Sequence, residues 1–298
     1  MGISLSLIAM LGFAANILLT RYAIVRLSVE AGFLVVLATN IVFPALLFAF
    51  EFMVREAPYA WNWKAAGLFA LGGVIGTFLG RWFLFDTVRL LGPSRASVFH
   101  STAPAFALIG AWLLAGERLG LYEIGLMVVI WLGLWFTQPR SALAAGGGAF
   151  EPANLRKGML VGLITVAGFG FGSVLRGLAM RDWDEAITGT VLGSAAALAC
   201  QLAATRNWAK VTAQLRAADR TALWLYAGCG ITTSLGAIFM SLAMNHMEIA
   251  LSVLVVHTTP LVIFPVSVFV LKNREELSPR TLLGAAMVLL GISLLAFR

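Results

Sequence analysis

The sequence predicts an all-α integral membrane protein with ten transmembrane helices, arranged as two inverted repeats of five helices. Three observations support this fold class. The composition is too apolar for a surface in water, the chain divides into apolar segments of membrane-spanning length, and its second half repeats its first half.

Composition excludes an ordinary soluble domain. Hydrophobic residues make up 60% of the 298 residues and charged residues 12%, whereas soluble domains carry about a quarter charged residues. The mean hydropathy is +0.91. The chain therefore has too few charged side chains to cover a globule in water, and a lipid bilayer is its expected surrounding.

Ten segments are apolar and, at about 20 residues each, long enough to cross a bilayer as helices. None of them shows the alternating pattern of a lipid-facing β-strand, and a helix satisfies its own backbone in lipid. We expect spans near residues 3–24, 31–53, 64–85, 94–115, 120–137, 157–179, 186–205, 221–243, 249–271 and 280–297.

The second half of the chain matches the first half at a shift of 156 residues. The matched pairs include Gly12/Gly168, Phe13/Phe169, Thr77/Thr233 and Pro104/Pro260, and a two-residue insertion then aligns Glu117 with Glu275. We expect a first five-helix repeat in residues 1–138 and a second in 157–298. Residues 139–156, which contain Pro139, three consecutive glycines and Pro152, read as the linker.

An odd number of spans in each repeat places the second repeat in the membrane with the opposite orientation. Inverted repeats of this kind are typical of secondary transporters, because they give two nearly equivalent states that open to opposite sides. We therefore expect alternating-access transport of a small organic metabolite, an amino acid or an organic acid. The alternatives are a polytopic membrane enzyme, for which no HExxH, GxSxG or Walker motif is present, and a channel.

Two prolines within spans mark the candidate binding region. Pro104 and Pro260 each remove a backbone donor, which frees the carbonyls of His100 and Val256 and predicts a kink in each helix. Polar side chains gather beside the kinks. They are His100, Ser101 and Thr102 in the first repeat, and His257, Thr258 and Thr259 in the second. Ionisable groups in spans tend to be functional, so we expect a shared central site; the alternative is a pair of histidines satisfied by neighbouring helices.

A third candidate is Arg81, which lies within the third apolar segment and precedes Trp82. In one interpretation Arg81 holds a carboxylate or phosphate of the substrate, aided by Trp82. In the other it pairs with another residue or snorkels to the membrane surface. The basic and aromatic character of the region favours a zwitterionic or anionic substrate.

Weaker candidates lie on the first and sixth spans. Asn16 and Thr20 share one polar face, and Ser173 and Arg176 occupy the matching stretch of the second repeat. These side chains, like the matched Thr77 and Thr233, could simply form hydrogen bonds between helices. Glycines 72, 76 and 80 recur at four-residue spacing, which predicts close helix packing.

Other features bound the function. The net charge of +7 comes from Lys and Arg residues at the ends of apolar runs, so we expect no nucleic-acid partner. Cys200 and Cys229 lie inside apolar runs with no metal-binding spacing, so we expect neither a metal nor a cofactor. We also expect no catalytic residues, and a monomer in the cell (inner) membrane.

More Lys and Arg residues fall on the side away from both termini, which favours termini outside the cell.

The chain resembles the drug/metabolite transporter superfamily in its EamA-domain branch. The resemblance covers nearly the whole chain and is carried by Leu91-Gly92-Pro93-Ser94-Arg95-Ala96-Ser97, by Pro104, and by Gly116-Glu117 before a helix with Gly125 and Gly133. The second repeat matches with Ala243, Ala250, Pro260, Glu275, Gly284 and Gly291. The resemblance implies ten helices, a central cavity, export or exchange of small metabolites, and cytoplasmic termini. This last point conflicts with the charge count.

Overall fold

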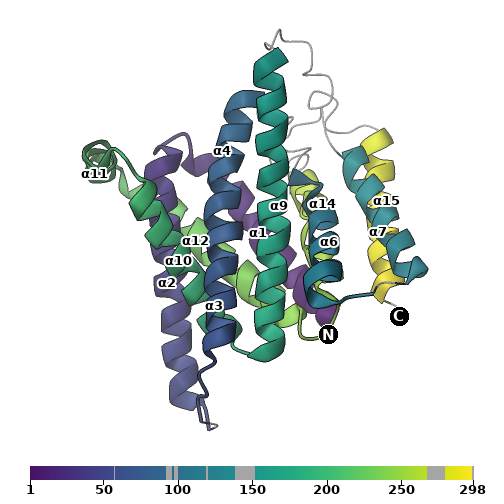
Figure 1. The fold of residues 1–298 in the computed structure, drawn as a ribbon. Coiled ribbons are helices and arrows are strands. Elements are labelled where there is room, and N and C mark those ends of the chain that lie inside the picture. The colour runs from purple at the N-terminus through teal and green to yellow at the C-terminus, as the bar shows by residue number, and fades with distance from the viewer. Residues whose placement is uncertain are drawn as a thin grey trace. The chain divides into compact units, whose positions relative to one another are not determined.

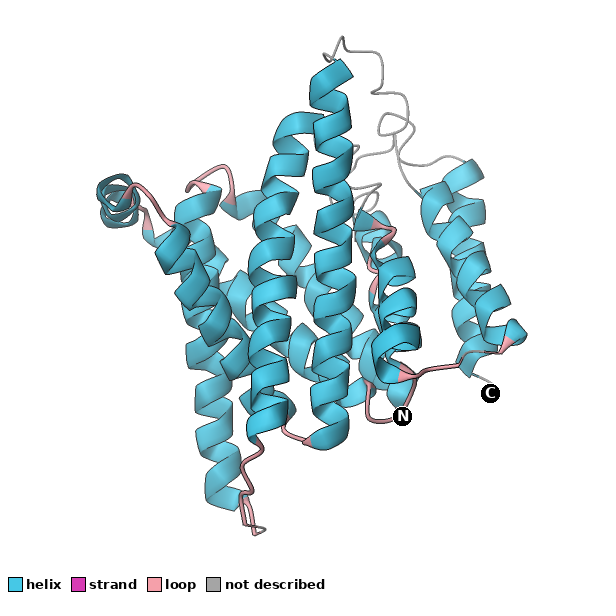
Figure 2. Ribbon diagram, in the orientation of Figure 1, coloured by secondary structure: helices cyan, strands magenta, loops and turns pink. Residues whose placement is uncertain are grey.

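The computed structural model describes residues 1–56, 58–91, 96, 100–118, 120–137, 152–266 and 279–296 (Figure 1). The described residues form helices joined by loops, with no strand among them (Figure 2). The helices are α1 Gly2–Ala23, α2 Val29–Val54, α3 Trp63–Gly72, the π-helix η1 Gly73–Leu79, α4 Gly80–Leu91, α6 Ala103–Ala115, α7 Leu121–Thr137, α9 Pro152–Asp182, α10 Ala186–Ala204, α11 Trp208–Ala217, α12 Arg220–Ala243, α13 Ile249–Val256, α14 Pro260–Pro265 and α15 Pro279–Ala296. The all-helical prediction is confirmed.

Within the described residues, six helical segments are long and apolar enough to cross a membrane: Gly2–Ala23, Val29–Val54, Trp63–Leu91, Arg156–Asp182, Ala186–Ala204 and Arg220–Ala243. Four shorter apolar helical segments coincide with parts of the remaining four predicted spans: Ala103–Ala115, Leu121–Phe136, Ile249–Ile263 and Pro279–Leu294. Parts of the fourth, ninth and tenth predicted spans lie outside the described residues, as do the first part of the 139–156 linker, most of the Leu91–Ser97 motif, and Glu275.

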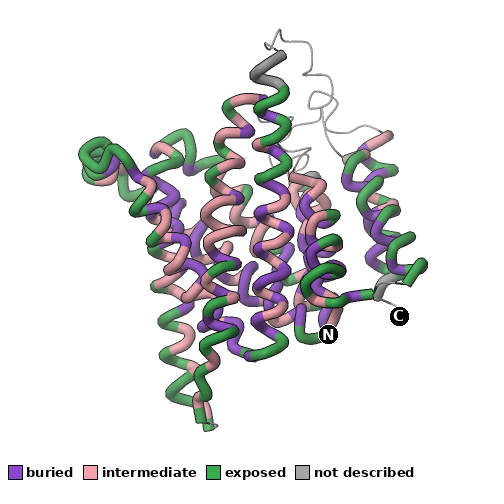
Figure 3. Tube along the Cα trace, in the orientation of Figure 1, coloured by how far each residue is buried: buried purple, intermediate pink, exposed green. Residues whose placement is uncertain are grey.

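Large apolar side chains remain exposed along helix faces, which is the arrangement that lipid contact requires. Figure 3 shows exposed positions along α2, α7 and α15. They include Val42, Leu46 and Phe50 on α2, Leu121 and Val128 on α7, and Leu282 and Leu289 on α15. Polar side chains are buried instead, such as Asn40 and Ser234, which form a hydrogen bond with each other.

The chain forms two compact units. Unit 1 contains residues 1–78 and 175–246, and unit 2 contains residues 79–174 and 247–298. Each unit takes helices from both sequence repeats. The long helix α9 contributes its N-terminal part to unit 2 and its C-terminal part to unit 1.

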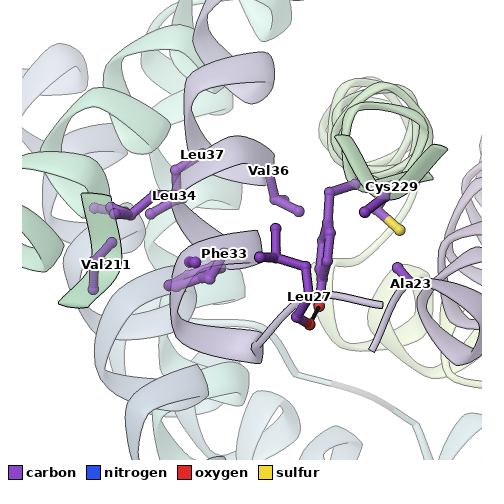
Figure 4. Close-up of a cluster of buried hydrophobic side chains, with 12 residues drawn as sticks. Ala23, Leu27, Phe33, Leu34, Val36, Leu37, Val211 and Cys229 are labelled. Carbon is purple, nitrogen blue, oxygen red and sulfur yellow. Dashed lines mark hydrogen bonds between the residues drawn. The ribbon is translucent and has the colours of Figure 1, made fainter. Parts of the chain in front are cut away.

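In unit 1, α1 packs on α12, and α2 packs on α10, α11 and α12. Apolar side chains of α1, α2, α11 and α12 form one buried cluster, in which Val211 and Cys229 lie on opposite sides of the α2 side chains (Figure 4). The phenol of Tyr226 donates a hydrogen bond of 3.0 Å to the carbonyl of Leu27 at the end of this cluster. Cys229 is buried, as expected for an apolar packing residue.

Local sequence sets where the helices of unit 1 begin. The side chains of Ser28, Asn62, Asn207 and Asp219 precede α2, α3, α11 and α12, and each accepts a hydrogen bond from a backbone N–H of the first turn. Such caps satisfy donors that have no partner within the helix. The amphipathic helix α11 lies between two spans and was not predicted, because its composition is too polar for a span.

Glycine permits one very close contact between helices in unit 1. A Cβ atom built on Gly73 would lie 2.0 Å from the carbonyl oxygen of Gly193 on α10. Gly73 is the first residue of η1 and was not among the glycines 72, 76 and 80 at which the sequence predicted close packing. Of those three, Gly80 packs tightly in unit 2, where a Cβ atom on it would lie 3.3 Å from the ring of Phe169.

An ionic and aromatic cluster joins the end of α2 to the turn between α9 and α10, also in unit 1. The guanidinium of Arg55 donates to Glu185 and Glu51 at 2.5 Å each, and it lies over the ring of Tyr59. The hydrogen bonds with Glu185 and then Glu51 raise the pKa of Arg55 above its usual value.

Burial raises the pKa of Tyr59, whose phenol donates to Thr188 at 3.3 Å. Trp183 packs edge-on against Tyr59.

In unit 2, α7 packs along α15, and α13 packs on α6 and α7. Gly133 and Gly291 permit the first of these contacts, since a Cβ atom on either would lie under 3 Å from the opposite helix. The carboxylate of Glu117, just after α6, accepts hydrogen bonds from the backbone N–H groups of Ile249 and Ala250. This carboxylate therefore serves as the N-terminal cap of α13.

Two of the predicted spans are interrupted. The fourth predicted span, 94–115, contains a turn at Ser101–Thr102, after which α6 begins at Ala103. The ninth, 249–271, contains a turn at residues 257–259 between α13 and α14. The linker predicted at 139–156 ends earlier than expected, because α9 begins at Pro152.

Candidate functional site

The two interruptions in unit 2 bring His100 and His257 together. Their ring centroids are 5.5 Å apart and the rings are tilted by 45°. His100 is the last described residue before one turn, and His257 is the first residue of the other. The expectation that one histidine from each repeat lies at a common level therefore agrees with the geometry. That these rings bind a solute stays a prediction.

Pro104 and Pro260 begin helices instead of kinking continuous ones, which corrects the prediction. Pro260 is the first residue of α14 and Pro104 is the second residue of α6, positions where the missing N–H leaves no hydrogen bond unmade. As expected, the Val256 carbonyl has no N–H partner four residues on, at Pro260. It accepts instead from Thr259, from its hydroxyl at 2.7 Å and from its backbone N–H at 3.4 Å.

Hydrogen bonding fixes the chemistry of His257. Its Nδ1 lies 2.8 Å from the carbonyl oxygen of Val253, and a carbonyl can only accept, so Nδ1 carries the proton. The neutral ring then presents Nε2 as an acceptor. If the ring gains a second proton, Nε2 becomes a donor with positive charge.

His100 is the less satisfied of the two rings. Its Nδ1 is shielded from solvent and has no hydrogen-bond partner in the described part of the chain. Buried polar atoms in proteins are normally paired, and an unpaired one requires an explanation such as a ligand or a bound water. Phe169 of α9 packs edge-on against the same ring, with centroids 5.0 Å apart.

The neighbouring threonines direct their hydroxyl protons to their own backbone. Thr258 donates to the carbonyl of Val255 at 2.6 Å, and Thr259 donates to that of Val256. Both residues are buried. Since a hydroxyl has one proton, these side chains can offer a ligand acceptor oxygens but no donor. In the first repeat, Ser101 and Thr102 form the turn itself and are half-buried.

The remaining candidates of unit 2 lie on α4 and α9. Arg81, the second residue of α4, is near enough for its charge to act on His100. Trp82 is 39% exposed, and its predicted role beside Arg81 stays a prediction. Ser173 donates to the carbonyl of Phe169 on its own helix at 2.9 Å.

Asn16 and Thr20 belong to unit 1, whereas the two histidines belong to unit 2. The hydroxyl of Thr20 lies 3.5 Å from the Asn16 side-chain oxygen and 3.4 Å from the sulfur of Cys229. These contacts fit the alternative that the two residues connect α1 to α12. No metal-binding cluster of His, Cys, Asp or Glu occurs among the described residues.

Two residues that position this region were not predicted as part of the site. Phe169 contacts His100, and its match to Phe13 in the repeat was the available signal. Glu117 caps α13, the helix that ends directly before His257. In the sequence, Glu117 stood out only as a residue that the two repeats share. A contact between residues so far apart in the chain leaves no local pattern.

Comparisons with known proteins agree with the fold. The sequence profile described as the EamA-like transporter family matches residues 1–138 and 156–297. A solved structure described as "Crystal structure of protein" is similar with a TM-score of 0.75 and 16% sequence identity, covering 99% of this chain and 96% of that chain. At this identity the similarity concerns the fold alone. No curated protein matches the sequence.

Proposed function

We propose that this chain, which belongs to the EamA-like transporter family, is a secondary transporter that moves a small organic metabolite by alternating access. It is a multi-pass membrane protein, and we place it in the cell (inner) membrane. The substrate class proposed is an amino acid or an organic acid. The paired His100 and His257 rings at two interrupted helices, with one buried ring nitrogen unpartnered in the described residues, carry the proposal.

Interrupted helices support a transport site for a physical reason. Within lipid, irregular backbone is tolerated only where it is buried in protein or lines a cavity, and transporter sites are built from such breaks. The turns at Ser101–Thr102 and 257–259 are irregular backbone of this kind; His100 directly precedes the first turn, and His257 begins the second. The six long and four shorter apolar helical segments fit ten spans in two inverted repeats.

The available side chains fit a zwitterion or an acid. The neutral His257 ring offers an acceptor nitrogen, and the buried Thr258 and Thr259 offer acceptor oxygens, which suits an ammonium group. A protonated histidine would instead donate to a carboxylate, with the charge of Arg81 nearby.

Counterflow into liposomes tests the proposal. Purified protein is reconstituted, loaded with unlabelled amino acids, organic acids or nucleosides, and assayed for uptake of the labelled compound. We expect counterflow of at least one amino acid or organic acid, and a loss of at least about tenfold in His100→Gln and His257→Gln. His246→Gln is the matched control, because His246 is exposed in a loop between α12 and α13.

Each contrary outcome has a defined meaning. Absence of counterflow for every compound, or ion currents far above carrier rates, would overturn the transporter proposal. Wild-type counterflow in both His100→Gln and His257→Gln, with equal amounts of reconstituted protein, would remove the histidine pair from the binding site.

A further inference from the structure

Unit 1 contains an arginine within a span that has a neutral partner. Arg176 lies on α9 inside the apolar segment Arg156–Asp182 and is half-buried. Its Nη2 donates a hydrogen bond of 2.6 Å to the hydroxyl of Thr77. In the described residues, no carboxylate lies within ion-pair distance of Arg176, whereas Arg55 in the same unit has two.

A cation in this position is expensive without an opposite charge. Lipid and packed protein both solvate a guanidinium poorly, so arginines in spans normally pair or serve the transported ligand. Thr77 supplies one neutral acceptor, whereas a guanidinium has five N–H donors in a planar fork. The hydrogen bond to Thr77 therefore orients the guanidinium but does not neutralise it.

The repeat shows that helix packing does not require this arginine. At the shift of 156 residues, Arg176 matches Thr20, and Thr77 matches Thr233. In the equivalent pair, Thr20 of the first repeat contacts Asn16 and Cys229, and the buried hydroxyl of Thr233 of the second repeat has no partner among the described residues. The helices α1 and α12 nevertheless pack closely, since a Cβ atom on Gly12 would lie 2.9 Å from the Thr232 carbonyl.

The segment that holds Thr77 is also irregular. Thr77 belongs to the π-helix η1, between α3 and α4, and Gly73 at its start packs against the backbone of Gly193. π-Helical turns are rare and occur frequently at functional sites. Thr77, which accepts the hydrogen bond of the guanidinium, therefore lies four residues after this close glycine contact, in the same π-helical segment.

From these observations we infer that Arg176 is a carboxylate-binding residue of the transported solute, held in place by Thr77. The inference rests on the proposed transport function and deepens it by assigning a residue to the carboxylate that both proposed substrate classes carry. A carboxylate pairs with the planar guanidinium through two parallel hydrogen bonds, which Lys cannot reproduce. The carboxylate would supply the opposite charge that the described residues do not.

Ligand-induced thermal stabilisation of the detergent-purified protein tests the inference. The probes are succinate, L-glutamate and L-alanine, each compared with its carboxamide, which has a similar shape and no carboxylate. We expect at least one carboxylate to raise the melting temperature in a saturable manner, and its carboxamide to have no such effect. The half-saturating concentration should rise at least tenfold in Arg176→Gln and less in Arg176→Lys, which keeps the charge.

The matched control is Arg181→Gln, on the same helix but exposed near its end, and it should behave as wild type. An unchanged half-saturating concentration in Arg176→Gln, equal stabilisation by a carboxamide, or no stabilisation by any carboxylate would overturn the inference. If Arg176→Gln does not fold, Arg176→Lys decides: unchanged carboxylate affinity there contradicts the bidentate contact.

Transport data separate this inference from the proposed function. Counterflow of a solute without a carboxylate, at the wild-type rate in Arg176→Gln, would overturn the role of Arg176 and leave the transporter proposal intact. Carboxylate binding that depends on Arg176, combined with an absence of counterflow for every compound tested with the wild-type protein, would retain the carboxylate contact but overturn the transporter proposal.

Discussion

The carboxylate of Glu117 accepts a hydrogen bond of 2.7 Å from the backbone N–H of Ile249, the first residue of α13. Its second oxygen lies 3.3 Å from the N–H of the next residue. Glu117 is 8% exposed, so water cannot readily replace it. One side chain of the first repeat therefore fixes where the helix that leads to His257 begins.

Removal of this cap should destabilise the protein. Glu117→Ala leaves two buried N–H groups unsatisfied, and we expect a loss of about 1–3 kcal/mol in the free energy of unfolding. Glu117→Gln should lose less, because its amide oxygen still accepts. Thermal unfolding in detergent measures both, with exposed Glu56→Ala as the control. Equal melting temperatures for Glu117→Ala and wild type would show that the contact does not stabilise α13.

The tautomer of His257 can be tested directly. Because Nδ1 donates to the Val253 carbonyl, we expect ¹⁵N spectra of histidine-labelled protein to show a neutral ring with a protonated Nδ1 and an unprotonated Nε2. The chain has three histidines, so His257→Gln and His246→Gln suffice to assign the signals. A protonated Nε2 in the neutral ring would contradict the proposed acceptor role.

Gly73 should tolerate no side chain. A methyl group there would overlap the Gly193 carbonyl, which is backbone and cannot rotate away. We expect Gly73→Ala to be destabilising by about 1–3 kcal/mol or more and to lower the yield of folded protein. Gly67→Ala, on α3, is the matched control, because its Cβ atom would meet nothing within 4 Å. Similar melting temperatures for the two variants would show that the helices separate easily.

The Arg55–Glu185 ion pair should contribute more than an exposed one. Its side chains are 19% and 10% exposed, against 76% and 37% for Lys64–Asp182. In double-mutant cycles we expect a coupling of about 1–3 kcal/mol for the first pair and at most about 1 kcal/mol for the second. Equal couplings would show that shielding from solvent does not strengthen the Arg55 pair.

The pH dependence of this contribution follows from the raised pKa of Arg55, caused first by its hydrogen bond to Glu185. A raised pKa adds stability that is complete below the ordinary pKa and is lost only when the pH passes the raised value. The difference in melting temperature between wild type and Arg55→Met should therefore stay constant from neutral to mildly alkaline pH. A difference that shrinks across this range would contradict the assignment.

Apolar run length predicted the helices well, because lipid allows few alternatives for a long apolar segment. It failed for α11, because this helix is largely polar and its buried residue is Val211. It also could not show that Pro104 and Pro260 begin helices. A proline in the sequence shows that one backbone donor is missing. It does not show that the hydroxyl of Thr259 bonds to the Val256 carbonyl in the turn before Pro260, which only the structure shows.

The candidate site was predicted in part for a similar reason. The repeat placed His100 and His257 at equivalent depths, and the structure brings their rings together. Arg176 was visible in the sequence, but its neutral partner Thr77 was not.

The difference between Arg176 and its counterpart Thr20 also has an electrical consequence. Moving one elementary charge through a membrane potential involves about 2.3 kcal/mol per 100 mV. Any displacement of α9 along the membrane normal carries the guanidinium through that field, whereas the same displacement of α1 at Thr20 moves no charge. The guanidinium of Arg176 therefore adds a voltage-dependent energy to such a displacement that Thr20 does not add, and an anion bound to Arg176 would cancel it.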